Sequence, residues 1–392
     1  MFFIYAAGAL FLYALVSERL EPTPISGPMV FAAIGVIGHA TGAIEPIRIT
    51  ESPIVALLEI TLALLLFTDA MNVHIASWEA DAKLPTRLLL IGMPLTIILG
   101  TGAAALIYPA VGVVAAATIA TILAPTDAAL GHAVVSNPRV PTRIREAIGV
   151  ESGLNDGIAL PILLFLIALG GTKEGEALWS LFVKGIGIAL VVGLAVGFGA
   201  GVAIRLASKH GWISRSWTQI AVVALAFVTF LATDHLGGSG FIAAYVAGHA
   251  FGRIVGEIDE DSGVLGEYMG TGLAMVSFLI FGAYILGPHL GGLTGAHVLY
   301  AVASLTVVRM IPVWISMTRT GARPPTVAFL GWFGPRGLAS IIFAGVLVEE
   351  SGVAGSEVII TAVIATVTLS IIAHGATAPW AAERYASWVD SR

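Results

Sequence analysis

The acidic and hydroxyl side chains of one apolar segment, residues 147–170, have a spacing that suits the binding of a small cation. The segment contains the run Glu151-Ser152-Gly153-Leu154-Asn155-Asp156. Ser152 and Asp156 are four residues apart and would share one face of a helix, while Glu151 and Asn155 would share the adjacent face. The first face offers a hydroxyl and a carboxylate, and such oxygen ligands prefer alkali and alkaline-earth ions over soft metals. The second face offers a carboxylate that an arginine could pair with.

The composition indicates that most of the chain is surrounded by a bilayer rather than by water. The 392 residues are 57% hydrophobic and 11% charged, whereas a soluble domain carries roughly 25% charged residues. The 46 glycines suit helices that pack closely in lipid. The absence of cysteine excludes disulfides, thiol chemistry and Cys-ligated zinc. The sequence contains no run of basic residues that would indicate a nucleic-acid partner and no phosphate-binding loop that would indicate a nucleotide.

Apolar stretches long enough to cross a bilayer predict an all-α polytopic membrane protein with about 13 transmembrane helices. They cover approximately residues 2–18, 26–44, 54–73, 87–108, 111–135, 147–170, 178–206, 217–234, 238–256, 268–288, 296–318, 326–348 and 357–381. The loops between them are short, so we expect residues 1–392 to form a single transmembrane domain with no soluble domain.

Two of these spans are interrupted in a way that predicts an internal repeat. Span 111–135 contains Ala124-Pro125, and span 326–348 contains Gly334-Pro335. Each is the fifth span of its half if the halves are residues 1–170 and 217–381, joined by a linker helix at 178–206. Paired interruptions at matching positions are typical of inverted repeats with a binding site near the membrane midplane. Irregular backbone at that depth must be buried by protein or line a cavity.

Several further charges lie within apolar segments, where each costs roughly 2.5–3.5 kcal/mol and therefore requires a partner or a function. They are Glu59, Asp69, Asp127, Asp234, Arg309 and Arg336. Asp127 directly follows the first interruption and Arg336 the second. No partner for Arg309 is evident from the sequence.

The distribution of basic residues predicts the orientation of the chain. Most of the 19 Lys and Arg residues lie in alternate loops. Because cytoplasmic loops carry the excess of basic residues, the N-terminus is expected outside and the C-terminus in the cytoplasm.

Three segments, taken in order along the chain, resemble a known family. They are Ala124-Pro125-Thr126-Asp127, Glu151-Ser152-Gly153-Leu154-Asn155-Asp156 and Gly334-Pro335-Arg336-Gly337-Leu338-Ala339. The segments, their order and the number of spans together make the whole chain resemble the cation/proton antiporter 1 family, the NhaP/NHE-type sodium/proton exchangers. The resemblance implies an NhaA-like antiporter fold with two discontinuous crossing helices, a homodimer, and no cofactor besides the transported ions. Because no regulatory tail of the eukaryotic kind follows the last span, we expect the cell (inner) membrane of a prokaryote.

The resemblance also implies a role for each residue of the ion site. Asp156 would bind either the cation or the proton, and Ser152 and the backbone of Thr126 would add oxygen ligands for a monovalent cation. Asn155 would hold the neutral position that marks electroneutral relatives. Asp69 is a further candidate ligand.

Two supporting roles follow from the same resemblance. Asp127 would balance the helix ends that face each other at the first interruption. Glu151 and Arg336 would form a buried ion pair, which is mainly structural because each needs the other to avoid an unpaired charge.

Together these features predict a monovalent cation/proton antiporter rather than an enzyme. If Asp156 accepts either a proton or a cation but never both, and only a neutralised site crosses the membrane, the protein exchanges the two. With Asn155 uncharged, one cation replaces one proton, which gives electroneutral exchange by alternating access. Na⁺ is the expected cation, and K⁺/H⁺ exchange is the alternative.

Other interpretations compete with this one. Gly237-Gly238-Ser239-Gly240 matches the G-x-S-G of intramembrane serine proteases, with His249, His289 or His297 as the base, but that chemistry leaves the buried acids unexplained. A channel would need rings of charges or carbonyls along a continuous pore. A single acidic cluster at one depth fits the binding site of a carrier better. Structural roles also compete at single residues. Asp156 could make a helix–helix hydrogen bond, Asp127 could only cap a half-helix, and Asp69 could lie at a solvated helix end.

Overall fold

The computed structural model describes residues 2–20, 23–44, 53–72, 83–127, 130–131, 134, 137–170, 175–255, 262–349 and 355–391. Within these ranges the regular structure is entirely helical. The elements of the first half are α1 (Phe2–Ala14), α2 (Ser17–Leu20), α3 (Gly27–Ala40), α4 (Pro53–Asn72), α6 (Lys83–Arg87), the π-helical turn η2 (Leu88–Gly92), α7 (Met93–Ile107), α8 (Val113–Ile122), α10 (Thr142–Gly170) and α11 (Gly175–Lys209). Those of the second half are α12 (Arg215–His235), α13 (Gly240–Val255), α14 (Val264–Ile280), the π-helical turn η3 (Phe281–Leu286), α15 (Gly287–His289), the 3₁₀ turn η4 (Leu290–Gly292), α16 (Gly295–Leu305), α17 (Val307–Met317), α18 (Pro324–Trp332), α19 (Leu338–Glu349) and α20 (Ser356–Asp390).

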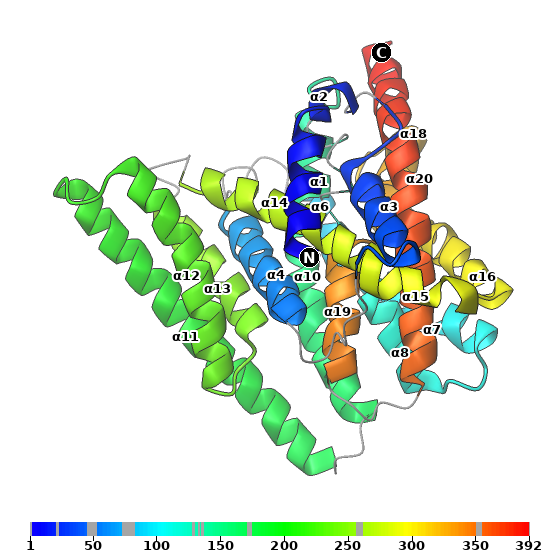
Figure 1. Cartoon of the computed structure of the whole chain (residues 1–392), viewed down its shortest axis with the longest axis horizontal. Helices are drawn as coiled ribbons and strands as arrows, with labels where there is room; N and C mark the ends of the chain where they lie inside the picture. The colour runs from blue at the N-terminus through cyan, green and yellow to red at the C-terminus, as the bar shows by residue number, and fades with distance from the viewer. Residues whose placement is uncertain are drawn as a thin grey trace.

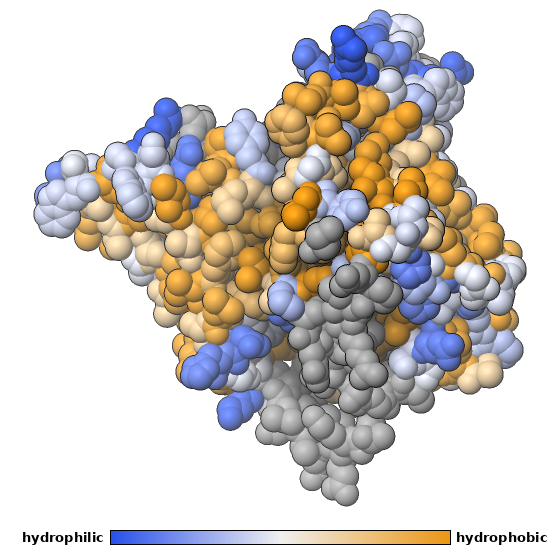
Figure 2. Space-filling view, in the orientation of Figure 1, coloured by the Kyte–Doolittle hydropathy of each residue, from blue (hydrophilic) through white to orange (hydrophobic). Residues whose placement is uncertain are grey.

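The helices confirm an all-α polytopic membrane protein. Among the described residues, eight helices are long and apolar enough to cross a membrane, and five shorter apolar helices accompany them. Each of the predicted spans coincides with one of these helices. The visible surface is apolar over most of its middle, and hydrophilic residues gather at the upper and lower margins (Figure 2). This distribution matches a bilayer bordered by water on both sides.

The helices pack as two groups. One contains α1, α3, α4 and α11 to α14, and the other contains α7, α8, α10 and α16 to α20. In Figure 1, α11, α12 and α13 lie at the left, and α7, α8, α16 and α20 lie at the right. Helices α4 and α10 lie between them and contact each other across the boundary. Any site that involves both α4 and α10 therefore lies between the two groups.

Glycines bring the helices of the first group into backbone contact. A β-carbon at Gly197 of α11 would lie 2.5 Å from the carbonyl oxygen of Ala247 on α13. A β-carbon at Gly248 or Gly252 of α13 would collide with the carbonyl oxygen of Phe67 or Met71 on α4. Small residues allow such close approach in membrane proteins. Helix α13 is thereby held firmly between α11 and α4.

Both predicted interruptions are present. Helix α8 ends at Ile122 and is followed by non-helical backbone through Asp127, and residues 333–337 separate α18 from α19. Pro125 and Pro335 lie within these breaks. Proline has no backbone N–H, and the residue before it avoids the helical conformation. The two discontinuous spans are therefore a direct consequence of the sequence.

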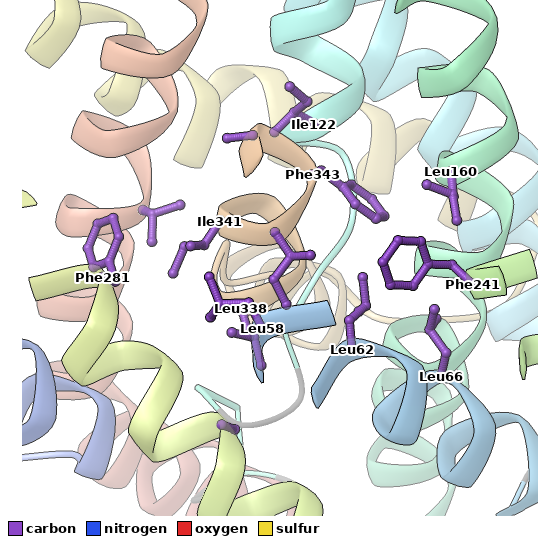
Figure 3. Packing of buried hydrophobic residues seen from close by; sticks show 14 of the residues in the cluster. Leu58, Leu62, Leu66, Ile122, Leu160, Phe241, Phe281, Leu338, Ile341 and Phe343 are labelled. Atoms are coloured by element: carbon purple, nitrogen blue, oxygen red, sulfur yellow. The ribbon is translucent and has the colours of Figure 1, made fainter. Parts of the chain in front are cut away.

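The half-helix α19 lies inside the protein rather than against lipid. Its residues Leu338, Ile341 and Phe343 are almost fully buried. Figure 3 shows them among apolar side chains from α4, α8, α10, α13 and η3, namely Leu58, Leu62, Leu66, Ile122, Leu160, Phe241 and Phe281. This packing shields the second break from hydrocarbon, as irregular backbone at membrane depth requires.

Candidate functional site

The two breaks cross and bond to each other through Asp127. The Asp127 N–H donates to the carbonyl oxygen of Pro335 at 2.8 Å. The Leu338 N–H, at the start of α19, donates to Oδ2 of Asp127 at 2.6 Å, and the Leu130 N–H donates to Oδ1 at 3.3 Å. A carboxylate at a helix N-terminus both satisfies an unpaired donor and opposes the positive end of the helix dipole. Asp127 therefore caps α19 from the other break.

Arg336 makes the complementary contact in the opposite direction. Its guanidinium NH1 donates to the carbonyl oxygens of Ala124 at 2.6 Å and Pro125 at 2.9 Å, just beyond the C-terminus of α8. Its backbone N–H donates to Ser370 Oγ at 2.7 Å. A cation is stabilising at the negative end of a helix. The crossing thus has a negative side chain at the start of one half-helix and a positive side chain at the end of the other.

The ion pair of Glu151 differs from the predicted one. Arg309 of α17, and not Arg336, donates to both carboxylate oxygens of Glu151, at 2.6 and 2.8 Å. Both side chains are almost fully buried. Arg336 instead donates through NH1 to the carbonyls beyond α8, and it lies close enough to Glu151 only for a longer-range electrostatic interaction. Gly334 leaves room for the pair, since any side chain there would collide with the guanidinium of Arg309.

A chain of polar side chains joins the first break to α10. Thr126 Oγ1 lies 2.9 Å from Ser152 Oγ, and Asn155 Nδ2 donates to Thr126 Oγ1 at 2.7 Å. The Thr126 side chain, which the sequence-based prediction had left aside in favour of its backbone, is the centre of this chain. Asn155 Oδ1 and Asp156 Oδ1 are buried and have no hydrogen-bond partner within the described residues. A buried carboxylate oxygen without a partner is costly unless a ligand completes it.

Asp69 lies at the same boundary, on α4. A β-carbon at Gly153 of α10 would lie 3.4 Å from the β-carbon of Asp69. Asp69 and Asp127 are both close enough to Asp156 to interact with it electrostatically. The structure thus brings together Thr126, Asp127, Ser152, Asn155, Asp156 and Asp69, while Glu151, which pairs with Arg309 of α17, lies five residues before Asp156 on α10.

The donors at this place are carboxylate, hydroxyl and amide oxygens from the first break, α10 and α4. In the part of the chain that the structure describes, no three His, Asp or Glu side chains are grouped as metal ligands. Neutral hydroxyl and amide oxygens accompany the carboxylates, and such hard oxygen donors match an alkali cation better than a soft metal.

Ser239 lacks the surroundings of a protease nucleophile. Its Oγ accepts the N–H of Ile242 at 3.4 Å at the start of α13. His289 and His297 bond within their own turns, to Ile285 and Thr294, and His249 bonds to the backbone of Ala70. Within the described residues, none of the three histidines is hydrogen-bonded to Ser239.

The sequence matches a family described as "Sodium/hydrogen exchanger, transmembrane" over residues 6–384. It is 25% identical over 400 residues to the K(+)/H(+) antiporter NhaP of Alkalimonas amylolytica, which covers 98% of this chain and 66% of that protein. It is also 25% identical over 406 residues to the Na(+)/H(+) antiporter NhaS2 of Synechocystis sp., which covers 95% of this chain and 68% of that protein. The chain thus spans about two thirds of the length of these relatives.

The fold is similar to that of the sodium proton antiporter MjNhaP1 from Methanocaldococcus jannaschii at pH 8. The TM-score is 0.74 at 18% sequence identity, and the match covers 98% of this chain and 100% of that one. At this level of identity the likeness concerns the fold alone.

Proposed function

The chain belongs to the sodium/hydrogen exchanger family, and from this premise we propose that it is a transporter that exchanges a monovalent cation for protons. The observation that carries the proposal is the buried oxygen of Asp156 beside the crossed breaks, which has no hydrogen-bond partner among the described residues. A carboxylate in that position is completed either by a proton or by a cation. Competition between the two at one group couples their movements when only the occupied, neutralised site changes its exposure from one side of the membrane to the other.

The neighbours of Asp156 support cation binding without adding charge. Ser152 and Thr126 offer hydroxyl oxygens, and the free Oδ1 of Asn155 offers an amide oxygen on the same side of α10. Because Asn155 is neutral, one cation replaces one proton, and exchange at this site is electroneutral.

Two cations are candidates for the exchange with protons. The two relatives described above are equally similar to this chain, and one is named for K⁺ and the other for Na⁺. We propose Na⁺ as the principal substrate and K⁺ as the alternative. Either ion fits a donor set of oxygens, and the space around Asp156 decides between them.

Movement between the two groups of helices would expose the site alternately to the two sides. Asp156 and Thr126 belong to one group and Asp69 to the other, so a shift at their boundary changes access to the carboxylate. We further propose that the chain consists of inverted repeats at residues 1–170 and 217–381, with 178–206 as the linker, and that each repeat contributes helices to both groups.

The setting of the protein forms part of the same proposal. We place it in the cell membrane, with its N-terminus outside and its C-terminus in the cytoplasm, as the positive-inside rule predicts. We also propose that it forms a homodimer. Chemical cross-linking in the membrane and protease accessibility of tagged termini test these two points.

Exchange is tested with purified protein in liposomes that contain a trapped pH dye and carry an acid-inside gradient. Addition of Na⁺ or K⁺ outside is expected to dissipate the gradient in the wild type and not in Asp156→Asn. Asp234→Asn is the matched control, because Asp234 is an exposed acid at the end of α12. If neither cation dissipates the gradient with the folded wild type, or if Asp156→Asn remains as active as Asp234→Asn, the proposal is wrong.

A further inference from the structure

The ring of Tyr245 on α13 packs against Gly157 of α10, the residue that follows Asp156. A β-carbon at Gly157 would lie 2.8 Å from Cδ2 and 2.9 Å from Cγ and Cε2 of the tyrosine ring. Such distances are shorter than carbon atoms tolerate, so the ring can occupy this position only because residue 157 has no side chain. Helices α10 and α13 therefore approach closely at this point because an aromatic ring packs against a glycine.

The same ring lies near the carboxylate proposed to bind the cation. The phenol of Tyr245 is close enough to Asp156 to interact with it electrostatically. Among the described residues, Asp156 Oδ1 is buried and has no hydrogen-bond partner, so a cation that completes it would lie among the groups packed around Asp156. Tyr245 is one of these groups.

The two residues belong to different groups of helices. Asp156 lies on α10, in the group that contains the breaks, whereas Tyr245 lies on α13, which is fixed against α4 by the glycine contacts at Gly248 and Gly252. Because α13 is held in this way and the ring is seated on Gly157, the tyrosine ring forms a constrained wall beside Asp156. Asp69 of α4 adds a second group to the same wall.

We infer that Tyr245 is a specificity-determining residue for the exchange proposed above, because its ring limits the space beside Asp156 that a cation can occupy. The inference rests on the proposed function and extends it to the choice of ion. A constrained wall discriminates against a larger ion, which must displace the ring or leave the carboxylate partly uncovered. A site without the ring admits larger ions and water, and so discriminates less.

Cation binding to the purified protein tests the inference separately from transport. The thermal stabilisation of wild type, Tyr245→Phe and Tyr245→Ala is titrated with Na⁺, K⁺ and Rb⁺, and Asp156→Asn gives the response that does not depend on the site. In Tyr245→Ala, the ratio of the half-saturating concentrations of Rb⁺ and Na⁺ is expected to fall by about fivefold or more, equivalent to about 1 kcal/mol. Tyr245→Phe keeps the ring and should keep the wild-type ratio within about twofold, or about 0.4 kcal/mol.

An unchanged ratio in Tyr245→Ala overturns the inference while leaving the proposed function intact. If the wild type responds to cations no more than Asp156→Asn does, the site itself is wrong and the inference is overturned with it. Failure of exchange in liposomes, with cation binding still dependent on Asp156, contradicts the proposed function alone.

A rescue experiment tests the contact between ring and glycine. Gly157→Ala places a methyl group inside the space of the ring and is expected to weaken cation binding by about tenfold, equivalent to about 1.4 kcal/mol. Tyr245→Ala in the same chain should restore binding, because it removes the collision. Gly149→Ala is the matched control on α10, since a β-carbon there would meet no atom of the described residues within 4 Å. Gly157→Ala behaving like Gly149→Ala, or a double variant no better than Gly157→Ala alone, contradicts the inference.

Discussion

Two acidic residues on one helix, Glu151 and Asp156 of α10, differ in how completely the protein satisfies them. Both oxygens of Glu151 accept hydrogen bonds from Arg309, and the pair is sealed from solvent. One oxygen of Asp156 is buried with no partner within the described residues. A satisfied buried acid has nothing further to bind, whereas an unsatisfied one has a position that a proton or cation can fill. The difference separates a structural acid from a functional one, five residues apart.

The largest expected effect is that the two acids respond oppositely to neutralisation. Asp156→Asn should abolish exchange, lowering its rate by at least about 100-fold (a change of roughly 2.7 kcal/mol in the barrier), because an amide cannot bind a proton in competition with a cation. It should leave the melting temperature of the purified protein unchanged or raise it, since a partly unsatisfied charge is removed. Exchange rates in liposomes and thermal unfolding in detergent measure the two effects. A folded Asp156→Asn protein that still exchanges ions would show that Asp156 is not the functional acid of the two.

Glu151→Gln should instead lower stability, by about 3–5 kcal/mol, because it leaves the Arg309 guanidinium buried and unpaired. The double variant Glu151→Met/Arg309→Met should be more stable than Glu151→Gln, since apolar side chains of similar volume can replace a buried pair. Denaturant or thermal unfolding of the three proteins measures this order. A Glu151→Gln protein as stable as the wild type would show that Glu151 is not the structural acid of the two.

Substitution of Gly337, where the two breaks cross, is expected to have a smaller effect on stability. A side chain there would collide with the carboxylate of Asp127, so Gly337→Ala should displace the cap of α19 and cost about 1–3 kcal/mol of stability. Gly345→Ala is the matched control in the same half-helix, because no atom lies within 4 Å of its β-carbon position. Equal melting temperatures for the two variants would contradict the capping role of Asp127.

The smallest expected effect concerns the neutral oxygens beside Asp156. Thr126→Val keeps the shape of the side chain but removes the hydroxyl that contacts Ser152 and Asn155. The loss of about 1 kcal/mol per hydrogen bond should raise the KM for the cation by about fivefold, with a smaller change in kcat. Thr118→Val is the control, because the Thr118 hydroxyl bonds only to Val114 of its own helix. A KM for Thr126→Val equal to that of the control would remove Thr126 from the site.

The sequence predicts the elements of this fold well because their causes are local. Composition and length are sufficient to place the spans. Pro125 and Pro335, each beside polar residues or glycines, mark the breaks, whereas Pro161, Pro312 and Pro379 lie inside continuous helices. The grouping of Ser152 with Asp156 follows from helical spacing alone. These features depend on neighbours in the chain and not on how the helices are rotated against each other.

Pairings across helices were less predictable. Arg309 and Arg336 both lie inside spans, and the sequence gives no rotation of α17 or register of the second break that would decide which of them faces Glu151. The number of buried arginines indicates that Arg309 and Arg336 have different partners, because two guanidinium groups need more than one set of acceptors. The carbonyl oxygens beyond α8 form the second set. Tyr245 gives no signal in the sequence, since its role depends on a glycine in a distant helix.

The central claim, that a proton and a cation compete for Asp156, is tested most directly by counting protons released when the cation binds. Purified protein in weakly buffered solution with a pH indicator is mixed with Na⁺ or K⁺ at a pH where the carboxyl is protonated. The account predicts release of about one proton per chain from the wild type and from Asp234→Asn, and none from Asp156→Asn, because a cation ligand must be deprotonated. Cation binding without proton release, or release that persists in Asp156→Asn, would contradict it.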